Sequence, residues 1–247
     1  MPVVVSPSRG PSAGVTCSED DDLINIRQYA RVTETAPGVD EPGGKPGSVL
    51  RIGLIASHDG TTAQAVIDAC ASGAIHGRVV LIISNNADGG VLRRAQNADI
   101  ATQHLSGKTH PDPTTLDGAI CQALKSAQVD VVALVGYMKR LGPLTLREFE
   151  GRIVNTHPAL LPRFGGQGMF GDRVHEAVLA AGEGVSGATV HLVTAEYDAG
   201  RILRQATVPV LPDDDVSSLG SRVRAAEKEL LIETLMGWDV SRAEAAP

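Results

Sequence analysis

Aromatic side chains are scarce in this sequence. Only 3% of its 247 residues are Phe, Trp or Tyr, which argues against the stacked aromatic platforms with which proteins bind single-stranded nucleic acid. The formal net charge of −7 also opposes a broad surface for a phosphate backbone. We therefore expect no nucleic-acid partner, although a small basic pocket for one phosphate is compatible with this charge.

Cysteine is rare, and long apolar runs are missing. Cys17, Cys70 and Cys121 are far apart and odd in number, which predicts neither a disulfide framework nor a zinc site. No stretch approaches the ~20 apolar residues that span a membrane, and the apolar run at the N-terminus is too short for a signal peptide. We expect a cytoplasmic protein with no membrane contact and no metal; the sequence does not indicate its oligomeric state.

Three regions differ in composition. Residues 1–48 are punctuated by Pro, Gly and Ser, contain an acidic run at 19–22 and close with EPGGKPGS, as linkers do. We predict an N-terminal appendage over 1–48, largely irregular, in which apolar residues between 23 and 32 could cover a patch of the main domain. The main domain is expected over 49–240 and a short tail over 241–247.

Apolar runs alternate with helical patterns from residue 50 onward, which is typical of βαβ units and a parallel sheet. Nearly unbroken Val, Ile and Leu in the first runs indicates strands buried on both faces. The predicted strands are 51–57, 78–84, 129–136, 152–157 and 188–194. Apolar residues at helical spacing predict helices near 63–70, 112–127 and 216–235. The expected fold class is α/β, a mostly parallel twisted sheet with helices on both faces.

Two short stretches imitate known motifs but lack a required residue. SGKTH at 106–110 contains the GKT of a phosphate-binding loop, yet Thr102 stands where its first Gly belongs. HEAVL opens like a zinc-protease helix but has Leu179 in place of the second His, so we expect its first residue, His175, on a helix surface. The turn SHDGTT at 57–62 lacks the glycines of a dinucleotide-binding loop, although helix amides could hold an anion there.

The stretch RIVNTH presents two polar side chains at the end of a strand. Asn155 and His157 lie two residues apart, so strand geometry places them on one face, at the sheet edge where α/β proteins bind ligands. An amide donor and an imidazole there could stabilise an oxyanion. The next strand leads to Asp198, whose carboxylate would favour a charged His157 and relay a proton. Each of the three also has a structural interpretation, as a satisfied polar residue or a turn-capping carboxylate.

With these residues in place, the chain resembles the folate-dependent phosphoribosylglycinamide formyltransferases over residues 51–235. The resemblance rests on six stretches in the same order: SHDGTT, ISNNAD, GYMKRLGP, NTHPALLPRFGG, SGATVHLVTAEYDAG and RVRAAEKELL. It implies a Rossmann-like formyltransferase fold and transfer of a formyl group from 10-formyltetrahydrofolate to the amine of glycinamide ribonucleotide, a step of purine biosynthesis. Neither a metal nor a covalent enzyme intermediate is implied.

The resemblance also implies roles for individual residues. Asn155 would bind the oxyanion, His157 would donate the proton, and Asp198 would raise the pKa of His157. The phosphate and ribose of the acceptor would lie against Gly60, Thr61, Thr62 and Glu227. The pterin of the folate would lie in a pocket that includes Met138, Lys139, Arg140, Leu141, Thr194 and Gly200.

The chain departs from the family pattern at two turns. His58 and Thr62 stand where the family's SGxGSN-type turn has Gly and Asn, and Arg201 replaces the Pro of its DxGP loop. Because these changes leave the three catalytic candidates intact, formyl transfer is better supported than the identity of the acceptor. The alternatives are a related transferase acting on another amine (an amino sugar or a specialised metabolite), a hydrolase that passes the formyl group to water, and a non-catalytic ligand-binding module.

Overall fold

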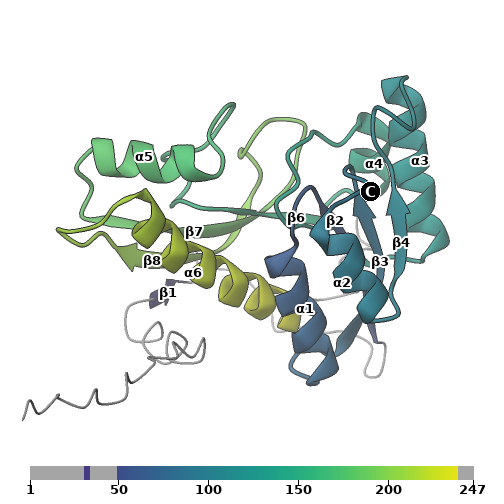
Figure 1. Cartoon of the computed structure of the whole chain (residues 1–247), viewed down its shortest axis with the longest axis horizontal. Helices are drawn as coiled ribbons and strands as arrows, with labels where there is room; N and C mark the ends of the chain where they lie inside the picture. The colour runs from purple at the N-terminus through teal and green to yellow at the C-terminus, as the bar shows by residue number, and fades with distance from the viewer. Residues whose placement is uncertain (1–30, 34–48, 239–247) are drawn as a thin grey trace, which may run out of the picture.

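One sheet of eight strands runs through the computed structural model, which describes residues 31–33 and 49–238 (Figure 1). Its strands, in spatial order, are β1 (Arg31–Thr33), β8 (Ile202–Pro209), β7 (Val185–Leu192), β6 (Ile153–His157), β5 (Val131–Leu134), β2 (Leu50–Ala56), β3 (Gly77–Ser84) and β4 (Ala101–His104). The five strands from β6 to β4 are parallel, whereas β7, β8 and β1 continue the sheet in antiparallel pairings. The predicted mostly parallel sheet is confirmed, with an antiparallel extension on the β6 side.

Six helices lie on the two faces of this sheet in the described residues. They are α1 (Thr61–Ala71), α2 (Gly90–Asn97), α3 (Pro113–Ser126), α4 (Pro143–Glu148), α5 (Asp172–Ala180) and α6 (Val216–Met236). One apolar cluster joins the sheet to α1, α2, α5 and α6, and a second joins it to α3 and to Phe149 at the end of α4. Alternate residues of β2 serve the two clusters, since Ile52 and Leu54 belong to the first and Ile55 to the second. Helices on both faces are therefore confirmed.

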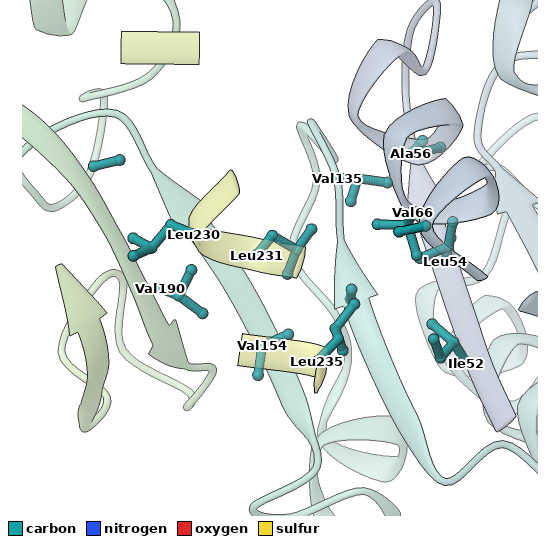
Figure 2. Packing of buried hydrophobic residues seen from close by; sticks show 14 of the residues in the cluster. Ile52, Leu54, Ala56, Val66, Val135, Val154, Val190, Leu230, Leu231 and Leu235 are labelled. Carbon is teal, nitrogen blue, oxygen red and sulfur yellow. The ribbon is translucent and has the colours of Figure 1, made fainter. Parts of the chain in front are cut away.

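Helix α6 supplies much of the first cluster. Its side chains Leu230, Leu231 and Leu235 are at most 1% exposed, and Figure 2 shows them beside Val154 and Val190 of the sheet. Burying a Leu side chain of this kind contributes about 1.5–3 kcal/mol. This packing fixes α6 across β6 and β7, the two strands that carry the candidate site.

Two helices begin where the sequence predicts. The carboxylate of Asp112 accepts the amide hydrogen of Thr115 at 2.8 Å, and Pro113 follows at the first helical position, as is favoured at helix starts. Asp215 caps α6 in the same way, through the Ser218 amide.

Some elements have no counterpart among the predicted ones. Strand β4 reads ATQH and is partly exposed, and β8 contains an Arg and a Gln within ILRQATVP, so neither shows the apolar run of a buried strand. The helices α2, α4 and α5 have only 8, 6 and 9 residues, so each offers few turns over which a helical period can be recognised in the sequence. The expectations for 1–30, 34–48 and the tail 241–247, with Cys17, lie outside the described residues.

The site is positioned by the junction of β6 and β7. Asn155 pairs with His191 across this junction, and His157 pairs with Thr189. The Thr189 hydroxyl donates to the Ala159 carbonyl at 2.6 Å and accepts from the Leu161 amide at 3.1 Å. The turn that follows His157 is thereby fixed to β7.

Candidate active site

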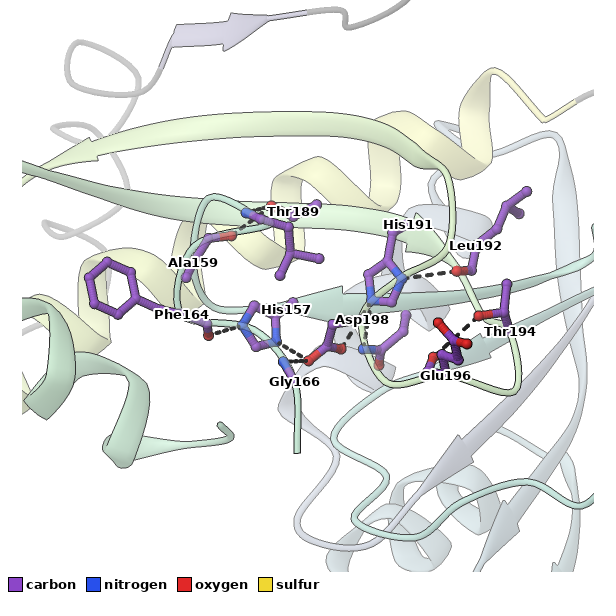
Figure 3. Close-up of polar contacts among 12 residues, drawn as sticks. His157, Ala159, Phe164, Gly166, Thr189, His191, Leu192, Thr194, Glu196 and Asp198 are labelled. Atoms are coloured by element: carbon purple, nitrogen blue, oxygen red, sulfur yellow. Dashed lines mark hydrogen bonds and ion pairs between the residues drawn. The ribbon is translucent and has the colours of Figure 1, made fainter. Parts of the chain in front are cut away.

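His157 occupies the end of β6 and is 3% exposed. Its Nε2 lies 2.7 Å from the carbonyl oxygen of Phe164, and its Nδ1 lies 3.5 Å from Oδ2 of Asp198 (Figure 3). Because a carbonyl oxygen only accepts hydrogen bonds, Nε2 carries a hydrogen. A second proton would therefore bind at Nδ1, beside the carboxylate.

Two opposing effects act on the His157 ring. Burial lowers its pKa below the ordinary value, and the Asp198 carboxylate with the Phe164 carbonyl offsets only part of that effect. The neutral ring is thus favoured in the protein, while the carboxylate stands ready to stabilise a proton at Nδ1. Such a group can both take up and release a proton near neutral pH.

Asp198 lies in the loop between β7 and β8 and adopts a left-handed backbone conformation with φ 52°. Its Oδ2 accepts the amide hydrogen of Gly166 at 2.8 Å. Burial alone would raise the pKa of Asp198, but the neighbouring His191 and His157 side chains and the hydrogen bond from the Gly166 amide hold this pKa below its ordinary value. Asp198 is therefore a carboxylate at neutral pH, and the loop returns it to the end of β6 as predicted.

A cavity of about 540 Å³ opens beside these residues. The predicted catalytic and binding residues that line it are Thr62, Met138, Lys139, Asn155, His157, Asp198 and Glu227. The structure thus brings the three catalytic candidates together with two of the four residues predicted to bind the acceptor.

A second, smaller cavity of about 100 Å³ adjoins the first. The predicted pterin-binding residues that line it are Lys139, Arg140, Leu141 and Thr194. Asn155 and Asp198 line both cavities, so the catalytic candidates stand where the two spaces meet.

Gly60, Thr61 and Gly200 line neither cavity. Gly60 has φ 73° directly before α1, and a Cβ there would lie 2.6 Å from Val91. A Cβ on Gly200 would lie 1.8 Å from the carbonyl oxygen of Leu192. Both glycines are therefore required for backbone packing in this structure, whatever they contact when a ligand is bound.

Glu227 projects from α6 and is half-buried. It accepts a hydrogen bond from the Thr156 side chain, but burial dominates and raises its pKa to about 7. The cavity therefore contains a carboxyl group that is partly protonated at neutral pH. Such a group can both donate and accept hydrogen bonds.

The expectation for His175 was wrong. This residue is 1% exposed and lies under α6, where a Cβ on Gly220 would be 3.0 Å from its Cδ2. The spacing to Val178, which is buried three residues later on the same helix, was the available signal. Sequence reasoning also gave no role to His191, Gly166 or Arg224, whose positions depend on long-range packing.

Comparisons with known proteins agree with this geometry. Residues 50–235 match the model of the formyl transferase family. A phosphoribosylglycinamide formyltransferase of Haemophilus influenzae is 37% identical over 180 residues, which is 73% of this chain and 82% of that protein. The chain therefore belongs to the formyl transferase family, and the resemblance seen in its sequence is confirmed.

Solved structures indicate the same fold. Glycinamide ribonucleotide transformylase 1 from Symbiobacterium toebii is 38% identical with a TM-score of 0.73, over 78% of this chain and 91% of that one. A formyltetrahydrofolate deformylase from Pseudomonas syringae is 26% identical with a TM-score of 0.68, over 80% of this chain and 62% of that one. The Rossmann-like α/β fold is therefore shared with proteins named for two different formyl-transfer reactions.

Two features are absent from the part of the chain that the structure describes, residues 31–33 and 49–238. No helix there is long and apolar enough to cross a membrane. No group of three or more His, Cys, Asp and Glu side chains there is arranged to hold a metal ion.

Proposed function

We propose that this chain transfers the formyl group of 10-formyltetrahydrofolate to the amine of glycinamide ribonucleotide. The observation that carries the proposal is the placement of Asn155 and Asp198 on the walls of both cavities. A folate with its pterin end at the smaller space and an amine in the larger would meet at these side chains and His157. Membership of the formyl transferase family supports the same reaction.

The reaction needs one bond to form and one to break. The acceptor nitrogen attacks the formyl carbon, and the carbonyl oxygen becomes an oxyanion to which Asn155 donates a hydrogen bond. The acceptor nitrogen gives up a proton, and N10 of the folate gains one as its bond to the formyl carbon breaks. The products are tetrahydrofolate and the N-formylated acceptor.

His157 is the group that fits this proton transfer. A proton taken up at Nδ1 would face the Asp198 carboxylate at 3.5 Å, and the resulting charged ring would also stabilise the oxyanion. The same ring would then return the proton to the folate nitrogen. Asp198 keeps its negative charge throughout, since its pKa is held below the ordinary value.

The larger cavity suits a phosphorylated sugar. Arg224 and Thr62, the latter in the first turn of α1, both line it, and an arginine side chain and a helix N-terminus are each groups that can hold a phosphate. Glu227 supplies hydrogen bonds for sugar hydroxyls. These features support glycinamide ribonucleotide over an acceptor that lacks a phosphate.

The test is incubation of the purified chain with 10-formyltetrahydrofolate and glycinamide ribonucleotide. Tetrahydrofolate release is followed by absorbance and the formylated ribonucleotide by mass spectrometry. We expect both products in equal amounts and neither without the acceptor. Formate release without any amine would instead establish a hydrolase, and transfer to a different amine would overturn the assigned acceptor only.

A further inference from the structure

His191 is a buried histidine in the site to which the proposed reaction assigns no step. It lies on β7 directly opposite Asn155 on β6, and it is 2% exposed. Figure 3 shows its ring between Leu192 and Asp198. Because a buried imidazole is costly unless its nitrogens are hydrogen-bonded, its partners define what the ring does.

The hydrogen positions on this ring follow from one contact. Nδ1 lies 2.9 Å from the carbonyl oxygen of Leu192, which only accepts hydrogen bonds, so Nδ1 carries a hydrogen. In the neutral ring Nε2 then presents a lone pair. The backbone of β7 thereby makes Nε2 of His191 an acceptor.

This acceptor determines how the Asn155 amide is oriented. Nδ2 of Asn155 lies 3.2 Å from Nε2 of His191 and can donate one of its two hydrogens to it. An amide rotated by 180° would place its oxygen against the same lone pair, which is repulsive. The amide nitrogen is therefore kept in place, and its second hydrogen is free to serve the cavity that Asn155 lines.

Asp198 completes the surroundings of the ring. Its Oδ1 lies 3.5 Å from Nε2 of His191, while its Oδ2 lies 3.5 Å from Nδ1 of His157. Of the two contacts at Nε2, the one with Asn155 is the shorter. A charged His191 would instead pair with Asp198 and compete with His157 for its carboxylate.

We propose that His191 is a positioning residue that directs a hydrogen of Asn155 at the oxyanion of the formyl-transfer reaction. The inference rests on the proposed function, because it needs an oxyanion beside Asn155. Removal of one preorganised oxyanion donor lowers kcat by about 10²–10³-fold in other enzymes. If only the orientation of the Asn155 amide is lost, kcat should fall by less than this 10²–10³-fold, and substrate binding should be unchanged.

A matched pair of variants separates the two contacts of the ring. In the His191→Gln variant, the side-chain amide of Gln lies near the position of Nε2, and its oxygen can still accept a hydrogen bond from Asn155. Asn in His191→Asn reaches only the position of Nδ1, so it keeps the Leu192 contact and leaves Asn155 without a partner. We expect His191→Asn to lower kcat about 10–100-fold with little change in either KM, and His191→Gln to stay within about 5-fold of the parent.

A double-mutant cycle with Asn155→Ala provides the decisive readout. Once the amide is gone, His191→Asn should lower kcat by no more than about 2-fold further, because coupled residues are not additive. Equal losses in both backgrounds would overturn the positioning role. Full activity of His191→Asn in an otherwise active enzyme would overturn it as well.

Folding and function are kept apart by two controls. Circular dichroism and thermal melting check that each variant is folded; if His191→Asn is not, His191→Leu, which fills the space without polar atoms, takes its place in the cycle. A parent chain that releases no tetrahydrofolate with glycinamide ribonucleotide overturns the proposed function, and this inference with it. If the parent is active and His191→Asn lowers kcat equally with and without Asn155, only the positioning role of His191 is overturned.

Discussion

At the scale of single residues, His157 combines a fixed nitrogen with a reactive one. Nε2 donates to a backbone carbonyl, whereas Nδ1 faces a carboxylate that can hold an added proton close by. The contact with the Phe164 carbonyl could not be seen from the sequence, whereas the approach of the Asp198 carboxylate to His157 was predicted from the loop that follows β7. The carboxylate comes from a loop more than forty residues later in the chain, and its arrival depends on the fold of the whole β7–β8 region.

Replacement of His157 by Ala should lower kcat for formyl transfer by at least ~100-fold, the usual scale for a general acid or base. The control is His76→Ala, because His76 is exposed and lines neither cavity. Steady-state kinetics with 10-formyltetrahydrofolate check both variants. Comparable activities of the two would show that His157 has no catalytic role.

Glu227 predicts a particular dependence of stability on pH. Its pKa is about 7 in the folded protein and about 4.3 in an unfolded chain, so between these values the folded state binds a proton that the unfolded state has lost. The contribution of this group to the free energy of unfolding is therefore greatest below about pH 4.3 and falls as pH rises toward about 7.

The variant Glu227→Gln removes this titration. Urea unfolding at pH 5 and at pH 7.5 should show the variant gaining stability relative to the parent as pH rises. Parallel stability profiles for the two proteins would contradict a raised pKa at Glu227. In kinetic assays the same variant should raise KM for the ribonucleotide more than it changes kcat.

At the scale of elements, the contact between α5 and α6 depends on the absence of a side chain. A Cβ on Gly220 would lie 3.0 Å from Cδ2 of His175 and 2.9 Å from Arg224, whereas a Cβ on Gly118 of α3 would meet nothing within 4 Å. Both glycines lie inside helices. They therefore form a natural comparison between a packed and an open position.

Gly118→Ala should stabilise the protein by about 0.5–1 kcal/mol, because Ala favours a helix interior. Gly220→Ala should bring no such gain, and the displaced His175 should make it destabilising. Chemical denaturation measures both. An equal gain from the two substitutions would mean that α5 does not pack on α6 as described.

The elements that could be predicted share one property. Because they are buried, their sequences show a recognisable pattern of apolar residues. Strands β2 and β5 are buried on both faces and read as Val, Ile and Leu, and α3 has a recognisable Asp-Pro start. His175 was misplaced because its polar side chain was given more weight than its helical spacing to the apolar Val178, which was the one sign of burial in this short helix. The relation of His191 to Asn155 was hidden for a different reason, since strand pairing between β6 and β7 brings together residues 36 positions apart.

At the scale of the molecule, the two apolar clusters share one sheet and should unfold together. The protein's single Trp, Trp238, packs against the cluster of α6, while Leu124 belongs to the cluster of α3. Leu124→Ala should lower the free energy of unfolding by about 2–5 kcal/mol.

Trp fluorescence and far-ultraviolet circular dichroism should report this loss at the same urea midpoint, although the substitution lies on the opposite face from the Trp. Such coincidence is the mark of a two-state transition. Two separate midpoints would show that the faces of the sheet unfold independently.

The short strand β1 has a consequence for how the molecule behaves in a crowded solution. Its three residues pair with β8 from Arg31 opposite Thr207 to Thr33 opposite Gln205, so part of β8 does not present bare amide and carbonyl groups to its surroundings. A bare strand edge is a template on which another chain can add. We therefore expect β1 to shield this part of the sheet edge from self-association, and deletion of residues 31–33 to favour aggregation rather than to change the chemistry of the site.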